Sequence, residues 1–221
     1  MDIEANIKAV RERIAEACRL AGRTPDDVKI VAVTKSVATA DIVRGHRAGL
    51  SDFGENRVQE ADAKISELST LAPRPAWHMI GHLQMNKVKV AVQIFDMFHS
   101  VDSIELAERM SRYTERALPV LLQVNVSGEV AKYGFPVDEV KPALDTIARL
   151  PGLTVEGLMT IAPIMHDAEQ SRPVFRELRR LQDSCGLKHL SMGMTNDFEV
   201  AIEEGATMVR IGRAIFGERT R

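Results

Sequence analysis

The segment Lys29-Ile-Val-Ala-Val-Thr-Lys35 is a short apolar run, rich in β-branched residues and bounded by lysines. Such a run is typical of a strand that is buried on both faces, as in a parallel sheet. Before it, apolar residues recur at steps of three and four, which predicts an amphipathic helix over residues 2–21. After it, a helix-like stretch follows at about residues 39–48. The chain therefore begins as helix, strand, helix.

The alternation of strand and helix patterns continues to the end of the chain. Further apolar runs predict strands at residues 52–56, 77–81, 97–101, 119–125, 155–160, 190–194 and 208–212. Helical patterns separate them at about residues 57–69, 84–94, 103–116, 137–149, 167–184 and 196–204. Strict alternation requires parallel pairing, because parallel neighbours need crossover connections.

Eight parallel strands can close on themselves, and a (β/α)₈ barrel needs at least about 200 residues. The 221 residues therefore predict an α/β fold, a lean TIM-type barrel with an extra N-terminal helix. We expect one domain over residues 1–221, because no linker or low-complexity tract interrupts the pattern. An open, doubly wound sheet is the alternative architecture.

Composition excludes several classes of protein. A formal charge of −2 gives no broad basic surface, which argues against nucleic-acid binding. No apolar run is long enough for a membrane span, so we expect a soluble protein with no membrane partner. Cys18 and Cys185 lack metal-ligand spacing, and we interpret both as free thiols of a reducing compartment. The expected location is cytoplasmic.

Lys35 closes the first predicted strand. In a barrel of this kind the active site lies at the C-terminal ends of the strands. Because side chains alternate along a strand, Val31, Val33 and Lys35 share one face. If that face is the barrel interior, burial favours the neutral amine, which is a usable nucleophile. The alternative is a lysine that extends from the strand end to water.

The loops after the last two strands form the second candidate site. They read Ser191-Met-Gly-Met-Thr-Asn196 and Arg210-Ile-Gly-Arg-Ala-Ile-Phe-Gly217. In many barrels these loops bind phosphate through backbone N–H groups and a short helix N-terminus. The glycines allow close backbone approach and the hydroxyl residues supply further donors, although such glycines also occur in plain turns. We also expect Asn196 to cap the following helix, with Glu199 as its partner. A lysine and a phosphate corner together predict a phosphorylated carbonyl compound held as an imine.

Six stretches in fixed order make the interpretation more specific. Between about residues 5 and 218 they read Val31-Ala-Val-Thr-Lys35, Phe53-Gly-Glu-Asn-Arg-Val-Gln-Glu60, Trp77-His-Met-Ile-Gly-His-Leu-Gln-Met-Asn-Lys87, Gly157-Leu-Met-Thr160, Ser191-Met-Gly-Met194 and Val209-Arg-Ile-Gly212. Together they resemble the pyridoxal phosphate homeostasis proteins. The resemblance implies a barrel like the N-terminal domain of alanine racemase. One departure lies directly after the lysine, where many members have a basic residue and a proline and this chain has Ser36-Val37-Ala38.

The resemblance also implies a cofactor and its ligands. It implies pyridoxal 5′-phosphate (PLP) bound as a Schiff base to Lys35, with Asn56 beside the ring and Arg210 at the pyridine nitrogen. It places around the phosphate Ser191, Thr195, Gly212 and Arg213. A charged guanidinium at the ring nitrogen opposes its protonation and weakens the electron sink that PLP catalysis uses. A structural arginine paired with an acid is the alternative for Arg210.

The resemblance implies a reversible PLP carrier without catalytic residues, which buffers the cofactor or delivers it to apo-enzymes. We expect a monomer. The alternative is an amino-acid racemase, which uses a second base, a tyrosine from a separate domain; this chain has only Tyr113 and Tyr133. A third candidate is an aldolase that uses the lysine without a cofactor.

Three further residues are candidates for contacts with a ligand or a metal. Lys132, in the loop after the fifth strand, is either a second PLP contact or a solvated lysine. His78 and His82 have the spacing of a metal pair on a helix but lie on a predicted strand and turn, so we expect no metal site.

Overall fold

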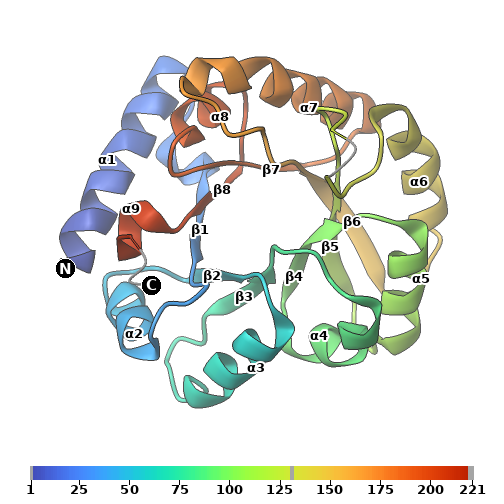
Figure 1. Ribbon diagram of the computed structural model, residues 1–221, viewed down its shortest axis with the longest axis horizontal. Helices are drawn as coiled ribbons and strands as arrows, with labels where there is room; N and C mark the ends of the chain where they lie inside the picture. The colour runs from blue at the N-terminus through green and yellow to red at the C-terminus, as the bar shows by residue number, and fades with distance from the viewer. Residues whose placement is uncertain (1, 130–131, 219–221) are drawn as a thin grey trace.

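Eight parallel strands form a closed barrel in chain order (Figure 1). The computed structural model describes residues 2–129 and 132–218. The strands are β1 (Lys29–Val33), β2 (Asp52–Glu55), β3 (Ala76–Met79), β4 (Met97–Val101), β5 (Leu118–Gln123), β6 (Leu153–Met159), β7 (His189–Met194) and β8 (Met208–Ile211). The predicted (β/α)₈ barrel is confirmed, and the open-sheet alternative is wrong because β8 pairs with β1.

Helices surround the barrel, and all of those in the described residues except the first and the last connect successive strands. They are α1 (Ile3–Leu20), α2 (Thr39–Arg47), α3 (Val58–Glu67), α4 (Val88–Ile94), α5 (Ile104–Tyr113), α6 (Val140–Ile147), α7 (Arg172–Cys185), α8 (Phe198–Glu203) and α9 (Arg213–Phe216). Short 3₁₀ turns occupy Pro25–Asp27, Met85–Lys87, Val137–Glu139 and Ala168–Ser171. Three of the predicted helices therefore begin with a 3₁₀ turn, which tightens the backbone where the first N–H groups lack helical acceptors.

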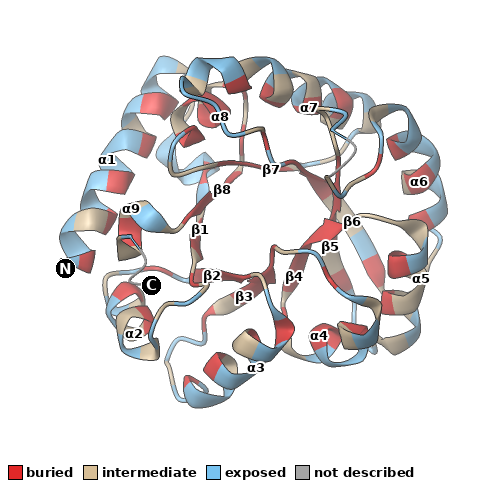
Figure 2. Cartoon of the chain, in the orientation of Figure 1, coloured by how far each residue is buried: buried red, intermediate tan, exposed pale blue. Residues whose placement is uncertain are grey.

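The sheet separates two cores (Figure 2). The inner core is a small apolar cluster of Val31, Ile80, Met97, Leu121, Met159 and Met208. The outer core lies between strands and helices and contains the large aromatic side chains, such as Trp77 and Phe98. Alternation along β1 is as predicted, because Val31 belongs to the inner cluster and Ala32 to the outer one.

Helix α1 packs across the helices that end the chain (Figure 1). The Asn6 side-chain amide donates to the Ile215 carbonyl at 2.9 Å. The Arg13 guanidinium pairs with Glu199 and lies 4.4 Å from the centre of the Phe198 ring. The extra helix therefore covers the seam where the last strand meets the first.

No helix in the described part of the chain combines the length and apolarity needed to cross a bilayer. Cys18 and Cys185 are both free thiols, and Cys18 lies on the buried face of α1.

Candidate functional site

The C-terminal ends of the strands surround a hollow mouth. One cavity of about 300 Å³ lies at the ends of β6, β7 and β8. Its lining includes Thr195, Arg210, Gly212 and Arg213, which are four of the predicted site residues. A volume of this size suits a small-molecule ligand. The structure therefore brings the predicted phosphate corner and Arg210 to a single cavity.

Lys35 lies beside this cavity, at the end of β1. It lines an adjoining depression together with Gly212 and Arg213, and a second depression together with Asn56. Gly212 and Arg213 also line the main cavity, so the first depression and the cavity share part of their walls. Lys35 itself is not in the lining of the main cavity. Among the described residues, no hydrogen bond or ion pair engages its ammonium.

The turn that carries Lys35 is tightly held. Strand β1 ends at Val33, two residues earlier than predicted. The Thr34 carbonyl accepts a hydrogen bond from the Lys64 ammonium at 2.6 Å instead of extending the strand ladder. Ser36 then adopts a φ of 59°, a left-handed conformation that is uncommon for a residue with a side chain. Its backbone N–H donates to the Glu60 carboxylate at 2.5 Å.

Lys64 is the centre of this arrangement. Its ammonium is 2.7 Å from both the Glu55 and the Glu60 carboxylates, and Glu55 is fully buried between β2 and α3. Burial raises the pKa of Glu55, although hydrogen bonds from Lys64 and Thr34 oppose this. For Glu60, burial is outweighed by hydrogen bonds from Lys64 and the Ser36 amide, and its pKa is lowered. The ionic cluster therefore ties both sides of Lys35 to α3.

Arg210 is buried, and side-chain and backbone oxygens hold it. One terminal nitrogen donates to the Ser191 hydroxyl at 2.6 Å and the other to the Thr160 carbonyl at 2.8 Å. Burial lowers the pKa of Arg210 to about 10, and the nearby Asp197 carboxylate opposes this shift. No ion pair with an acid engages Arg210 among the described residues, which removes support for the alternative of a structural salt bridge. The guanidinium is a fixed cation at the floor of the cavity.

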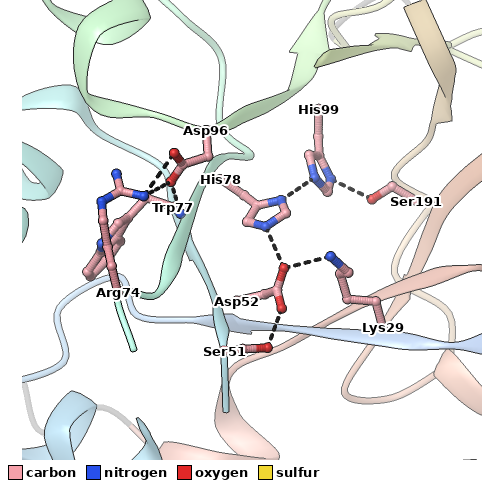
Figure 3. Close-up of polar contacts among 9 residues, drawn as sticks. All are labelled: Lys29, Ser51, Asp52, Arg74, Trp77, His78, Asp96, His99 and Ser191. Atoms are coloured by element: carbon pink, nitrogen blue, oxygen red, sulfur yellow. Dashed lines mark hydrogen bonds and ion pairs between the residues drawn. The ribbon is translucent and has the colours of Figure 1, made fainter. Parts of the chain in front are cut away.

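Ser191, which binds Arg210, begins a polar chain that runs through the barrel interior to Asp52 (Figure 3). The Ser191 hydroxyl is 2.8 Å from His99 Nδ1, and His99 Nε2 is 2.9 Å from His78 Nδ1. His78 Nε2 then contacts the Asp52 carboxylate at 3.0 Å. Ser191 is fully buried, and its hydroxyl belongs to this chain. Its predicted contact with the phosphate stays a prediction.

The surroundings of Asp52 and His99 determine which of these two side chains is charged. Burial opposes ionisation of Asp52, but hydrogen bonds from His78, Ser51 and Lys29 prevail and lower its pKa. His99 is in the opposite situation, because burial, His78 and Arg210 together lower its pKa well below the usual range. The carboxylate end is therefore charged, and His99 is neutral.

The phosphate corner differs from expectation in one detail. Gly212 precedes α9 and Thr195 lines the cavity, as predicted. Asp197, not Asn196, occupies the N-cap position of α8, and its carboxylate accepts a hydrogen bond from the Met194 backbone N–H at 2.7 Å instead of capping the helix. Asn196 instead accepts a hydrogen bond from Arg213 at 3.3 Å.

Gly193 is required for packing rather than for access to a ligand. Its φ is +87°, a left-handed conformation that favours glycine. A Cβ atom at this position would lie 2.6 Å from Ala201 and 2.9 Å from the Phe198 backbone. The close approach that the glycine allows is therefore that of helix α8.

The remaining candidates lie at the rim. The Lys132 ammonium pairs with Glu129 at 2.6 Å, and its role as a second PLP contact stays a prediction. Beside it, the Tyr133 ring stacks on His82 at 3.8 Å. His82 and His78 have separate partners, because His82 binds Asp102 at the rim and His78 lies in the barrel interior.

Sequence reasoning missed two groups, the cluster around Lys64 and the histidine chain. The inward positions of β3 and β4 carry His78 and His99, which alternation alone could have indicated. Their partners lie on strands far apart in the sequence, so their contacts could not be predicted.

Comparison with known proteins agrees with the geometry. Residues 4–220 match the family described as alanine racemase, N-terminal domain. The pyridoxal phosphate homeostasis protein of Pseudomonas aeruginosa is 43% identical, over 98% of this chain and 96% of its own. That of Aquifex aeolicus is 42% identical, over 96% of each chain. The structure of PipY from Synechococcus elongatus with PLP bound is 37% identical, with a TM-score of 0.81 over 92% of this chain and 100% of that one.

Proposed function

This chain belongs to the pyridoxal phosphate homeostasis protein family, and we propose that it binds PLP as a Schiff base on Lys35 for intracellular PLP homeostasis. In this role it buffers the cofactor or delivers it to apo-enzymes, without robust catalysis. Two findings support the proposal. Its relatives are named pyridoxal phosphate homeostasis proteins, and the structure of PipY has PLP bound.

The observation that carries the proposal is the position of Lys35. Val31 and Val33 face the barrel interior, and Lys35 lines, together with Val33, a depression beside the cavity. Its ammonium has no partner among residues 2–129 and 132–218, so no internal ion pair competes with a ligand. When bound, PLP supplies an aldehyde that condenses with a lysine amine and releases water.

The cavity fits the remaining groups of PLP. We assign the phosphate to the Thr195 hydroxyl and to the Gly212 and Arg213 backbone amides, because the first N–H groups of a helix lack intrahelical acceptors. We assign the pyridine nitrogen to Arg210 and the ring flank to Asn56. A guanidinium at the ring nitrogen opposes protonation of the ring and weakens its electron sink, which agrees with storage of the cofactor.

Borohydride reduction followed by peptide mapping tests the anchor. The purified protein should absorb in the visible with PLP, and reduction should fix one PLP on Lys35. Lys35→Ala should lose both signals. Lys87→Ala is the matched control, because Lys87 lines the same depression as Lys35 and should not carry the label. An unchanged spectrum in Lys35→Ala, with the label on Lys132 or another lysine, would show that the assignment is wrong.

Pyridoxal, which lacks the phosphate, tests the phosphate corner. Charge-assisted hydrogen bonds contribute about 1.5–3 kcal/mol each, so pyridoxal should bind far more weakly than PLP. Titration of the wild-type protein and of Thr195→Ala with both ligands measures this difference. Thr195→Ala should weaken PLP binding and leave pyridoxal binding unchanged. Equal affinities for the two ligands in the wild-type protein would exclude a phosphate site here.

A further inference from the structure

The interior of this barrel is unusually polar. Barrel interiors of this type are normally filled by layers of branched apolar side chains. Here buried inward positions on five strands, β2, β3, β4, β7 and β8, carry Asp52, His78, His99, Ser191 and Arg210. Each of these side chains has at least one polar partner in the chain, at 2.6–3.0 Å. The chain joins the cavity at one mouth to a depression at the opposite mouth, which Lys29 and Asp52 line.

The order of the protons follows from the donors at the Arg210 end. A guanidinium is always a donor, so the Ser191 oxygen accepts from Arg210. The other partner of the Ser191 hydroxyl among the described residues is His99 Nδ1, which therefore accepts the hydroxyl proton. A neutral His99 then carries its proton on Nε2 and donates it to His78 Nδ1.

The Asp52 end of the polar chain requires the same order of donors and acceptors. The Asp52 carboxylate is an acceptor, so His78 Nε2 carries a proton. His78 Nδ1 is then free to accept from His99, and no two donors face one another. Reversing the chain would point both His99 Nδ1 and Arg210 at the Ser191 oxygen and leave the hydroxyl proton without an acceptor among the described residues.

We propose that Asp52, His78, His99 and Ser191 form a proton-ordered chain that holds the Arg210 guanidinium in one orientation, with its remaining donors toward the cavity. These four are positioning residues for Arg210. The consequence for PLP rests on the proposed function. Because the Ser191 proton is engaged by His99, the ring nitrogen meets only the donors of a permanent cation. The buried chain therefore helps to keep the ring in the form that suits storage.

The proton order can be measured in the protein without PLP. Side-chain ¹⁵N NMR should show that His78 and His99 each carry the proton on Nε2 and not on Nδ1. Asp52→Asn should change these tautomers, because an amide can donate as well as accept. Asp96→Asn is the matched control, since Asp96 directly precedes β4 at the same end of the barrel as Asp52 but binds Arg74 and the Trp77 amide instead (Figure 3). An Nδ1–H tautomer or a charged ring at either histidine of the wild-type protein would overturn the proposal.

Hydrogen exchange of the Arg210 guanidinium tests positioning at a distance. Asp52→Asn should speed this exchange at least about tenfold, although Asp52 does not touch Arg210, and Asp96→Asn should leave it unchanged. His99→Phe should act like Asp52→Asn, whereas His99→Gln, which keeps one donor and one acceptor, should restore slow exchange. Equal exchange in Asp52→Asn and wild-type protein would refute the chain even if His99→Phe does not fold.

Binding of PLP separates this proposal from the proposed function. None of the variants touches Lys35, so borohydride should still label Lys35 in Asp52→Asn. Ring-labelled PLP should then show a changed pyridine ¹⁵N shift in Asp52→Asn and an unchanged one in Asp96→Asn. Loss of labelling in the wild-type protein would refute the proposed function and leave the histidine tautomers to be judged alone. An unchanged ¹⁵N shift in Asp52→Asn, with labelling intact, would refute the effect on the cofactor.

Discussion

Lys35 and Lys64 carry the same charge in opposite environments. The Lys64 ammonium is buried and binds two carboxylates and a backbone carbonyl, so all its donors are engaged. The Lys35 ammonium lies beside the cavity and has no partner in the described part of the chain. A lysine that is fully engaged supports structure, whereas one that is held in place but unpaired is available for chemistry.

His99 gives a prediction about stability and pH. Its pKa is lowered in the folded protein by burial, so the unfolded chain binds more protons below about pH 6.5, the usual histidine value. The stability that neutral His99 contributes is complete above that pH and is lost as the pH falls below it. Between about pH 7 and pH 5, the free energy of unfolding measured in urea should therefore fall less in His99→Gln than in the wild-type protein. Equal losses in both proteins would mean that His99 is not the titrating group.

At the scale of elements, the junction of β2 and α3 determines where β1 stops. Strand β2 contributes Glu55, and α3 contributes Glu60 and Lys64 at helical spacing. Together they bind the Thr34 carbonyl and the Ser36 amide, on either side of Lys35. The helix therefore positions a turn that belongs to the preceding βα unit.

Removing the buried cation of this junction should be costly. Lys64→Met leaves two carboxyl groups without their partner, and breaking a buried ion pair typically costs about 3–5 kcal/mol. Adding Glu55→Gln should recover part of the loss. Lys8→Met is the control, because Lys8 is exposed and lies 3.9 Å from Glu12. Urea unfolding of the wild type and the three variants measures these free energies. A decrease below about 1 kcal/mol in Lys64→Met would mean that the cluster contributes no more than a surface ion pair.

The β7–α8 junction gives a second test at this scale. Gly193→Ala combines a left-handed φ with a Cβ atom 2.6 Å from Ala201. Gly186→Ala is matched in conformation, with a φ of +64°, but its Cβ atom would meet nothing within 4 Å. Backbone strain should lower the free energy of unfolding of both variants by about 1 kcal/mol or more. The decrease should be larger in Gly193→Ala because α8 must move. Equal losses in thermal unfolding would mean that α8 adapts freely.

At the scale of the whole molecule, the barrel has two different ends. The C-terminal mouth contains the cavity, Lys35 and the phosphate corner. The opposite mouth carries the Lys29–Asp52 ion pair, and α1 covers the outside of the seam between β8 and β1. The histidine chain is the polar connection between the two mouths (Figure 3).

Turnover distinguishes a carrier from a catalyst. Racemisation needs a base on each face of the substrate, whereas Lys35 is the only base that we assign, and the Arg210 guanidinium opposes protonation of the ring. With L- or D-alanine we expect no racemisation and negligible exchange of the α-hydrogen with deuterium. We expect PLP to pass to an apo-enzyme faster than in buffer alone. Racemisation at about 1 s⁻¹ or more, abolished in Lys35→Ala, would support a racemase instead.

Local pattern was sufficient for the fold but not for the residue at which each strand ends, since β1 stops at Val33 rather than at Lys35. Periodicity is a property of neighbouring residues, so the eight strands, the first helix and the inward face of Val31 and Val33 could be predicted from the sequence. The place of Lys35 at the mouth followed from the same alternation.

Contacts between distant segments depend on barrel closure, which local pattern does not describe. Strand β1 stops at Val33, and Lys64, 30 residues further along the chain, binds the Thr34 carbonyl. No pattern near β1 indicates this contact. The Ser191 hydroxyl turns toward His99 because β4 and β7 face one another across the closed barrel. Buried polar groups must find partners among whatever the closed fold brings near, and only the tertiary structure identifies those partners.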